Sequence, residues 1–329
     1  MSTRSFDGKR VLITGISGFG GSWLAETILK NEKKAKIFGL KRETTSTQNN
    51  DHIIKELKLI DADITDKNIV FEAVEEIDPQ IVFHLAAISS SVRAEENPKA
   101  TEITNVGGTK NLLDALAENA SNLEIFHFAS SSSVYKKINS SVPINEKHPL
   151  GAHDIYSESK IKAEKICNDY SRTKKIPVII TRAFNQGGPR CREDIVANKI
   201  AKSVVSAKKD GIKEFVFGNV NSVRDFIDVR DVVEGYWLAA KKGVANSVYN
   251  LCSERGIRIL DMIDMSLDYV GLSKDEVKIV VDKKFLRRDE ADVVIGDNSK
   301  ARKELSWKPK IPFEQTLKEM IDNYLSASD

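Results

Sequence analysis

Cysteine is scarce in this chain, and its few positions are not paired. Cys167, Cys191 and Cys252 are odd in number, far apart and free of any Cys-x-x-Cys spacing. Disulfide frameworks and zinc sites both depend on closely patterned cysteines. Neither is expected here, and we expect no bound metal.

Long apolar runs are also missing. No stretch approaches the roughly 18 consecutive apolar residues that cross a bilayer. Residues 1–10 include four charged side chains and lack the apolar core of roughly 7–15 residues that a signal peptide needs. We therefore expect a cytoplasmic protein with no membrane partner.

The chain has almost no excess of charge of either sign. Its 50 lysines and arginines are scattered and are balanced by 48 acidic residues, which leaves a net charge of +2. A nucleic-acid-binding protein needs a basic stripe to neutralise phosphates, so we expect no nucleic-acid partner. The length of 329 residues is enough for one α/β domain and a smaller lobe.

Short apolar runs alternate with amphipathic segments through the first half, which is typical of parallel strands joined by crossover helices. Strands are expected at residues 10–14, 36–40, 58–60, 80–85, 123–129 and 177–181. Helical spacing is found at residues 21–31, 66–77, 100–117 and 156–172. The predicted fold class is α/β, with a Rossmann-type doubly wound parallel sheet of six strands and a smaller C-terminal lobe.

A glycine turn follows the first predicted strand. Gly15, Gly18 and Gly21, with Ser17 and Phe19 between them, stand where this strand gives way to a helix. Glycines let the backbone turn tightly and approach a pyrophosphate at the positive end of the helix. The spacing is Gly-x-x-Gly-x-x-Gly rather than the commonest dinucleotide fingerprint, and a purely structural turn is the alternative.

The pattern of short strands and helices changes after about Phe184. Helices and short strands are expected at residues 195–209, 214–217, 225–227, 248–250, 259–270, 298–304 and 313–325. We interpret residues 1–184 as a dinucleotide-binding domain to which a segment near 225–250 returns. Residues 185–329 would mainly form the smaller lobe and cover the carboxyl edge of the sheet.

The residues after the second predicted strand bear on the choice of dinucleotide. An NAD enzyme would place an acid there to bind the ribose 2′-hydroxyl. Lys41 and Arg42 instead offer positive charge for a 2′-phosphate, which favours NADP, with NAD as the alternative. Glu43 is adjacent, so these charges could also form a solvated cluster. Asp63, after the third strand, either accepts from the adenine amine or belongs to a helix cap.

Tyr156 and Lys160 form a Tyr-x-x-x-Lys pair on one face of a predicted helix. A nearby ammonium favours the ionised phenol, so it brings the tyrosine pKa of about 10 toward the range for proton transfer at neutral pH. Such a pair is weak evidence alone. It gains weight because the fifth predicted strand ends in serines 130–133, at the carboxyl edge of the sheet.

With these motifs the chain resembles the extended short-chain dehydrogenase/reductases that modify nucleotide sugars, over nearly its whole length. Further matching segments are residues 84–87, 105–109 and 182–189. In the second half the resemblance is greatest to GDP-mannose 4,6-dehydratases and GDP-4-keto-6-deoxymannose reductases, through residues 218–219, 224–226, 296–300 and 307–309.

The resemblance implies a nucleotide-sugar substrate and a role for each matching residue. Ser131 would hydrogen-bond the reacting sugar oxygen, Tyr156 would be the acid/base, and Lys160 would hold the nicotinamide ribose and tune Tyr156. The further cofactor-binding residues are Ile64, Leu85, Ala86 and Ala87, and the diphosphate contacts are Asn185, Arg224 and Arg287. The family also implies a homodimer packed through residues 100–117 and 156–172.

One position departs from the dehydratase pattern. In that family an acidic residue, usually Glu, stands two residues after the catalytic Ser or Thr, but Ser132 and Ser133 follow Ser131 here. Elimination of water needs a general acid and base. We therefore expect reduction of a 4-keto-6-deoxy sugar nucleotide, with 4-epimerisation or 4,6-dehydration as the alternative. Glu146 could supply the missing carboxylate, and a non-catalytic dinucleotide sensor is a weaker alternative.

Overall fold

The protein has the predicted α/β fold with a doubly wound parallel sheet. The computed structural model describes residues 3–137, 142–282 and 291–326. Seven parallel strands lie in the order β10-β6-β5-β4-β1-β2-β3. Their bounds are Arg10–Thr14 (β1), Lys36–Lys41 (β2), Leu57–Asp61 (β3), Ile81–His84 (β4), Ile125–Ser131 (β5), Val178–Ala183 (β6) and Ser247–Leu251 (β10). The strand order reverses between β1 and β4, which opens a crevice at the carboxyl ends of the strands.

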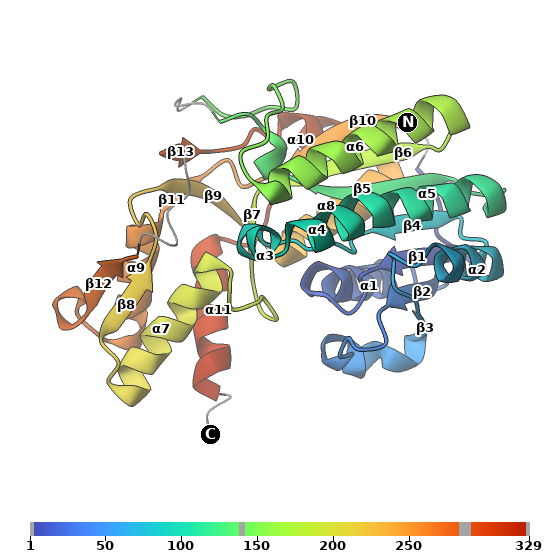
Figure 1. Ribbon diagram of the computed structural model, residues 1–329. Helices are drawn as coiled ribbons and strands as arrows, with labels where there is room; N and C mark the ends of the chain where they lie inside the picture. The colour runs from blue at the N-terminus through green and yellow to red at the C-terminus, as the bar shows by residue number, and fades with distance from the viewer. Residues whose placement is uncertain (1–2, 138–141, 283–290, 327–329) are drawn as a thin grey trace.

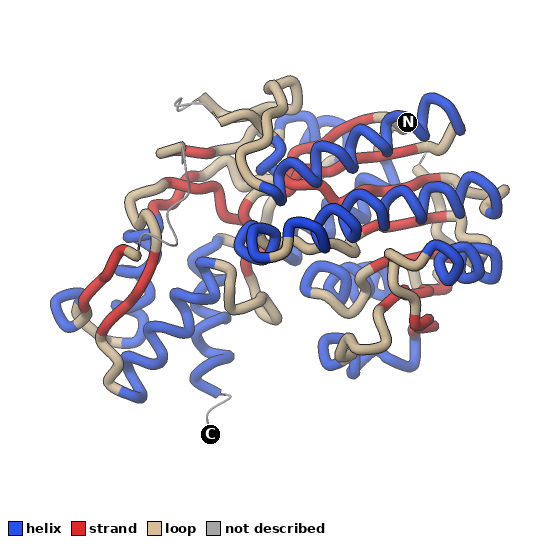
Figure 2. The backbone as a smooth tube through the Cα atoms, viewed as in Figure 1, coloured by secondary structure: helices blue, strands red, loops and turns tan. Residues whose placement is uncertain are grey.

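Helices cover both faces of this sheet because its strands are apolar on both faces. Along β1, Val11 and Ile13 face one buried cluster and Leu12 faces the other. The first face is covered by α1 (Phe19–Asn31) and α8 (Val229–Lys242), and the second by α2 (Lys67–Ile77), α5 (Gly108–Asn119) and α6 (Ile155–Lys174). Figure 2 shows the strands enclosed between helices.

The large sheet has seven strands and not the six expected, because the segment after residue 225 adds β10 to it. Within that segment, β9 (Val223–Asp228) belongs to a separate small sheet. Helix α8, which was not predicted, then packs against α1, and β10 pairs with β6 as the edge strand. The chain therefore reaches the large sheet again only from Val229 onward.

The helix expected at residues 100–117 is interrupted by a π-helical turn. The segment comprises α4 (Pro98–Thr101), the π turn η2 (Glu102–Gly107) and α5. Asn105 lies in the π turn, and its amide nitrogen donates to the carbonyl of Ile88 at 3.0 Å and to Ser159 Oγ at 2.9 Å. The turn thus ties the segment after β4 to helix α6.

A second lobe lies beside the carboxyl edge of the large sheet (Figure 1). Its core packs α7 (Val196–Asp210), α9 (Ile259–Val270) and α11 (Phe313–Ser326) against the strand pair β8 (Glu214–Phe217) and β12 (Lys278–Val281). The small sheet joins β9 to β7 (Asn185–Gly187), β11 (Gly256–Arg258) and β13 (Val293–Val294). None of the helices in the described ranges is both long enough and apolar enough to cross a membrane.

Further short elements complete the described chain. They are η1 (Gln48–Glu56), α3 (Ser91–Glu96), η3 (Ser132–Val134), η4 (Lys274–Glu276) and α10 (Ser299–Leu305). The last of these packs against α8 and β10. Residues near the C-terminus therefore support the first half of the fold as well as the second lobe.

Candidate active site

One large cavity brings the predicted site residues together. Its volume is about 1930 Å³, and it runs from the ends of β1 and β2, past the ends of β5 and β6, to the second lobe. Of the predicted residues it is lined by Gly15, Ser17, Gly18, Phe19, Gly21, Lys41, Arg42, Asp63, Ile64, Leu85, Ala86, Ala87, Ser131, Tyr156, Lys160, Asn185 and Arg224. The remaining one, Arg287, lies outside the described residues.

The glycine turn at the end of β1 has the shape and the chemistry that fit a diphosphate. Gly15 has a φ of +70°, and a Cβ at Gly21 would lie 2.2 Å from the Gly15 carbonyl oxygen, so neither position accepts a side chain. Gly18 is the N-cap of α1 and leaves the first helical turn without a side-chain cap. The buried Ser17 Oγ has no hydrogen-bond partner among the described residues. These unsatisfied donors point to an anionic ligand.

The two basic residues after β2 differ in their surroundings. Lys41 Nζ forms an ion pair with Asp61, on the neighbouring strand β3. Arg42 is exposed at the mouth of the cavity. Arg42 is therefore the better placed of the two to meet a 2′-phosphate, because the charge of Lys41 is already balanced.

Asp63 takes part in a turn rather than capping the helix. Its Oδ1 accepts from the Thr65 backbone nitrogen at 2.9 Å and from the Thr65 hydroxyl at 2.8 Å. The N-cap of α2 is Asp66, which accepts from the backbone nitrogens of Asn68 and Ile69. Asp63 still lines the cavity.

A buried histidine fixes the cavity wall that follows β4. His84 Nδ1 lies 2.7 Å from Thr14 Oγ1, and its Nε2 lies 2.9 Å from Thr109 Oγ1. Thr14 Oγ1 also accepts from the backbone nitrogens of Leu85 and Ala86, at 3.2 and 3.1 Å. Burial, with smaller contributions from nearby positive groups, lowers the pKa of His84 to about 3. The neutral His84 ring thus holds Thr14, and Thr14 in turn positions the cavity-lining residues Leu85 and Ala86.

Helix α6 presents Tyr156 to the cavity. The helix begins with a capping box in which Asp154 accepts from the Ser157 backbone nitrogen at 2.7 Å. Burial raises the pKa of Tyr156 to about 12, while a hydrogen bond from Ser131 acts to lower it. Tyr156 is thus held as a neutral phenol beside the Ser131 hydroxyl.

The ammonium of Lys160 has a different partner from the one expected. Its Nζ donates to the carbonyl of Ala129 at 2.8 Å and lies 4.8 Å from the centre of the Phe128 ring. Among the described hydrogen bonds, none joins Lys160 to Tyr156. Burial lowers the pKa of Lys160 to about 8. Lys160 lines the same cavity as Tyr156 but is anchored to the end of β5.

The serines after β5 form a local hydrogen-bonded group without a carboxylate. Ser131 Oγ accepts from the Ser133 backbone nitrogen at 3.2 Å and from the Ser133 hydroxyl at 2.9 Å. Glu146, the candidate replacement acid, accepts from the Asn250 backbone nitrogen at 2.8 Å. Its side chain faces the β10 edge and is not part of the described cavity wall. The proposed reacting position therefore has hydroxyl groups where a dehydratase has an acid.

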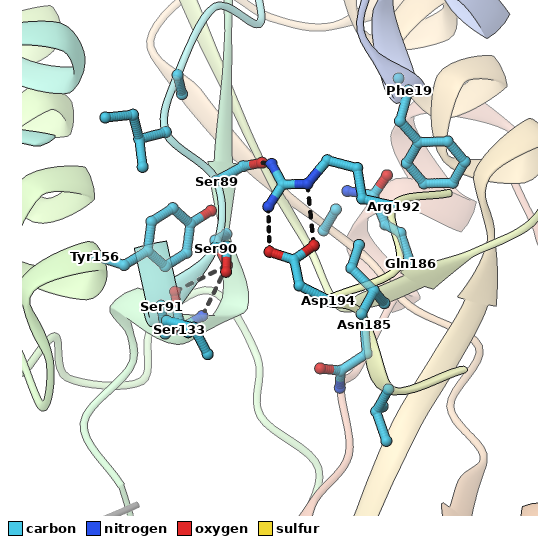
Figure 3. Close-up of a pocket in the computed structure, with 18 of the residues that line it drawn as sticks. Phe19, Ser89, Ser90, Ser91, Ser133, Tyr156, Asn185, Gln186, Arg192 and Asp194 are labelled. Carbon is cyan, nitrogen blue, oxygen red and sulfur yellow. Dashed lines mark hydrogen bonds and ion pairs between the residues drawn. The ribbon is translucent and has the colours of Figure 1, made fainter. Parts of the chain in front are cut away.

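The second lobe supplies the far end of the cavity. Asn185 Nδ2 donates to the Asp225 carbonyl at 3.2 Å, and Arg224 Nη1 donates to the Val223 carbonyl at 2.8 Å. Among the charged residues of the cavity wall that were not predicted are Arg192 and Asp194, which lie near Tyr156 and Ser89 (Figure 3). They lie just after the 182–189 motif, and that position is the only sequence signal that could have found them.

Comparison with known proteins agrees with this geometry. The family model described as GDP-mannose 4,6 dehydratase matches residues 12–320. The chain belongs to this family. It is 30% identical to GDP-mannose 4,6 dehydratase 1 of Arabidopsis thaliana, over 100% of this chain and 95% of that protein.

Solved structures of related enzymes show the same fold. RMD from Pseudomonas aeruginosa, complexed with NADPH, is 26% identical with a TM-score of 0.81, and the match covers 97% of this chain and 99% of that one. UDP-glucuronic acid 4-epimerase from Bacillus cereus, in complex with UDP-glucuronic acid and NAD, is 26% identical with a TM-score of 0.83 and the same coverage.

The chain is thus an enzyme, a nucleotide-sugar oxidoreductase of the dehydratase/epimerase type. The main expectation, a 4-keto reductase, has less support than its alternative. The relatives named as GDP-mannose 4,6-dehydratases favour the alternative, epimerisation or dehydration, over simple reduction.

Proposed function

We propose that this enzyme is an NAD(P)-dependent nucleotide-sugar 4-epimerase. The observation that carries the proposal is the group of serines beside Tyr156 at the end of β5, in which Ser133 donates to Ser131 and stands where a dehydratase has its carboxylate. Oxidation and re-reduction at C4 need one proton-transfer group and one hydrogen bond to the reacting oxygen. Elimination of water needs an additional acid and base.

A nicotinamide dinucleotide supplies, when bound, the hydride acceptor and donor for such a reaction. Gly15, Ser17 and the N-terminus of α1 would hold its diphosphate. Lys160 would hold the nicotinamide ribose once it leaves the Ala129 carbonyl. Arg42 supports a preference for NADP, because its exposed guanidinium would pair with a 2′-phosphate.

Tyr156 and Ser131 would carry the proton chemistry on the sugar. The bound dinucleotide would accept the hydride from C4, and Tyr156, in its ionised form, would take the proton of the 4-hydroxyl, which leaves a 4-keto group. Ser131 donates a hydrogen bond to the same oxygen and stabilises the charge that develops there. The epimer would form when the hydride returns to the opposite face of C4 and Tyr156 returns the proton to the C4 oxygen.

Dehydration at carbons 5 and 6 is the second candidate, because the curated relatives carry that name. It would require a carboxylate from another part of the cavity wall, where Glu95, Asp154 and Asp194 are present. The relatives also support GDP as the nucleotide, and Asn185, Arg224 and Arg287 would contact its diphosphate.

The test uses GDP-mannose and the UDP-, CDP- and dTDP-linked glucoses, each deuterated at C4 and incubated with enzyme and either NAD or NADP. An epimerase yields a chromatographically distinct product of unchanged mass that retains the deuterium. Loss of one water from the product would instead establish the dehydratase. Steady NADPH consumption with a 4-keto-6-deoxy sugar nucleotide, without either product, would restore the reductase. Tyr156→Phe serves as the inactive control in each reaction.

A further inference from the structure

Arg192 and Asp194 form an ion pair in the wall of the active-site cavity. Arg192 Nε donates to Asp194 Oδ1 at 3.0 Å, and Arg192 Nη2 donates to the second carboxylate oxygen. The two side chains are 31% and 24% exposed, so the pair is partly accessible to water. The two parallel contacts give the guanidinium and the carboxylate a fixed relative geometry.

The pair bridges two parts of the chain across the cavity. Arg192 Nη1 lies 3.4 Å from Ser89 Oγ, in the segment after β4, and Arg93 Nε of helix α3 lies 3.6 Å from Asp194 Oδ2. Arg192 and Asp194 themselves precede α7 of the second lobe. Figure 3 shows the pair on the side of the cavity toward which the Tyr156 hydroxyl points.

The charged and titratable groups around Tyr156 come from several elements. Lys160, on the same helix, directs its ammonium to the Ala129 carbonyl. Asp154 lies at the start of the helix, and the buried Tyr236 of α8 lies within electrostatic range. Arg192 is the cation that approaches Tyr156 from the second lobe, and its partner Asp194 lies between Arg192 and Ser90.

We propose that the Arg192–Asp194 pair is an electrostatic positioning element for Tyr156, in which Asp194 sets how much of the Arg192 charge the phenol experiences. This inference rests on the proposed role of Tyr156 in proton transfer. The contact of Arg192 with Ser89 fixes the guanidinium relative to the segment that follows β4. The second lobe therefore contributes to the proton-transfer site as well as to substrate binding.

Arg192 acts on the Tyr156 pKa with the sign that this arrangement requires. Burial dominates and raises the pKa, Ser131 and Arg192 lower it, and Asp154 raises it. Arg192 and Ser90 hold the pKa of Asp194 below its ordinary value, so Asp194 stays ionised at neutral pH. Removing Asp194 therefore leaves the Arg192 charge without this partner beside the cavity, and removing Arg192 leaves Asp194 with the longer contact to Arg93.

The test measures ionisation of Tyr156 directly, with tyrosine labelled with ¹³C at Cζ and followed by NMR as the pH is raised. Tyr156→Phe identifies the signal among the seven tyrosines. We expect Arg192→Gln to move ionisation to higher pH and Asp194→Asn to move it to lower pH. Each shift should be roughly half a pH unit, because both groups are partly exposed. Arg192→Lys should ionise Tyr156 at a pH closer to that of the wild type. The double variant, Arg192→Gln with Asp194→Asn, should ionise it near the wild-type pH.

Opposite shifts from the two single variants support the proposal, because a merely structural bridge is broken by both substitutions alike. Shifts of the same sign, or none, would overturn it. Circular dichroism over the same pH range establishes that each variant is folded, and Arg192→Met replaces Arg192→Gln as the uncharged variant if the latter does not fold. The measurement needs no substrate, so failure of the epimerase proposal would appear in the product assay and not here. With an active substrate, the alkaline limb of the turnover profile should move in the same directions.

Discussion

Mild acid is expected to destabilise this protein through two buried histidines. His84 and His127 are both fully enclosed, and burial lowers the pKa of each to about 3. Thr109 donates its proton to the Asn105 carbonyl at 2.6 Å, so its oxygen accepts from His84 Nε2. Thr14 already accepts from two backbone nitrogens and therefore donates to His84 Nδ1. A protonated His84 would have no acceptor at Nδ1.

The size of the effect follows from proton binding. An unfolded histidine takes up a proton near pH 6.5, whereas the folded ones stay neutral until about pH 3. The unfolded state therefore binds more protons below pH 6.5, and stability falls as the pH falls. Each histidine costs about 1.4 kcal/mol per pH unit, so the pair removes about 4 kcal/mol between neutral pH and pH 5. That is a large part of the stability of an ordinary domain.

Urea unfolding at neutral pH and at about pH 5, followed by circular dichroism, measures this loss. His84→Gln keeps one donor and one acceptor in the buried site and should lose roughly half as much stability over the same interval. A wild-type loss below roughly 1 kcal/mol, or an equal loss in the His84 variant, would contradict the reasoning.

Other predictions concern the cavity. Tyr156→Phe should lower turnover by roughly 10²–10⁴-fold with little effect on dinucleotide affinity, as judged by fluorescence titration and initial rates. Arg42→Ala should weaken NADPH binding more than NADH binding, whereas Lys41→Ala should affect the two more equally because Lys41 is paired with Asp61. Equal effects of Arg42→Ala on both cofactors would count against NADP. Gly21→Ala should abolish dinucleotide binding or folding, because its Cβ would overlap the carbonyl oxygen 2.2 Å away.

The strands and helices that carry the glycine turn and Tyr156 could be predicted because local patterning determines them. Apolar runs bounded by turns gave β1 to β6 to within a few residues. Helix α8 was missed although its apolar residues Val229, Val232, Val233 and Tyr236 recur at helical spacing. Periodicity could have found that helix, but not the sheet that β10 joins, because strand pairing is a non-local property.

The motifs predicted which residues line the site, but they did not predict which partners the side chains contact. Sequence spacing placed Tyr156 and Lys160 on one helix face, yet the fold offers the Lys160 ammonium the nearer carbonyl of Ala129. Arg192 and Asp194 carry no spacing that links them to Ser89, a hundred residues earlier in the chain. Their contact depends on how the second lobe meets the sheet, which local sequence does not encode.

Strand β10 joins the large sheet from far along the chain, and this affects how the protein folds while it is being synthesised. Strand β6 acquires its parallel neighbour only when β10 has been synthesised, and α8 receives the indole of Trp307, whose Nε1 donates to the Asp231 carbonyl at 2.9 Å. A nascent chain that has emerged only as far as residue 184 would expose an unpaired strand edge and one apolar face of α1. The N-terminal half therefore lacks contacts that only residues 229–307 supply, and we expect its folding to finish after those residues have been synthesised.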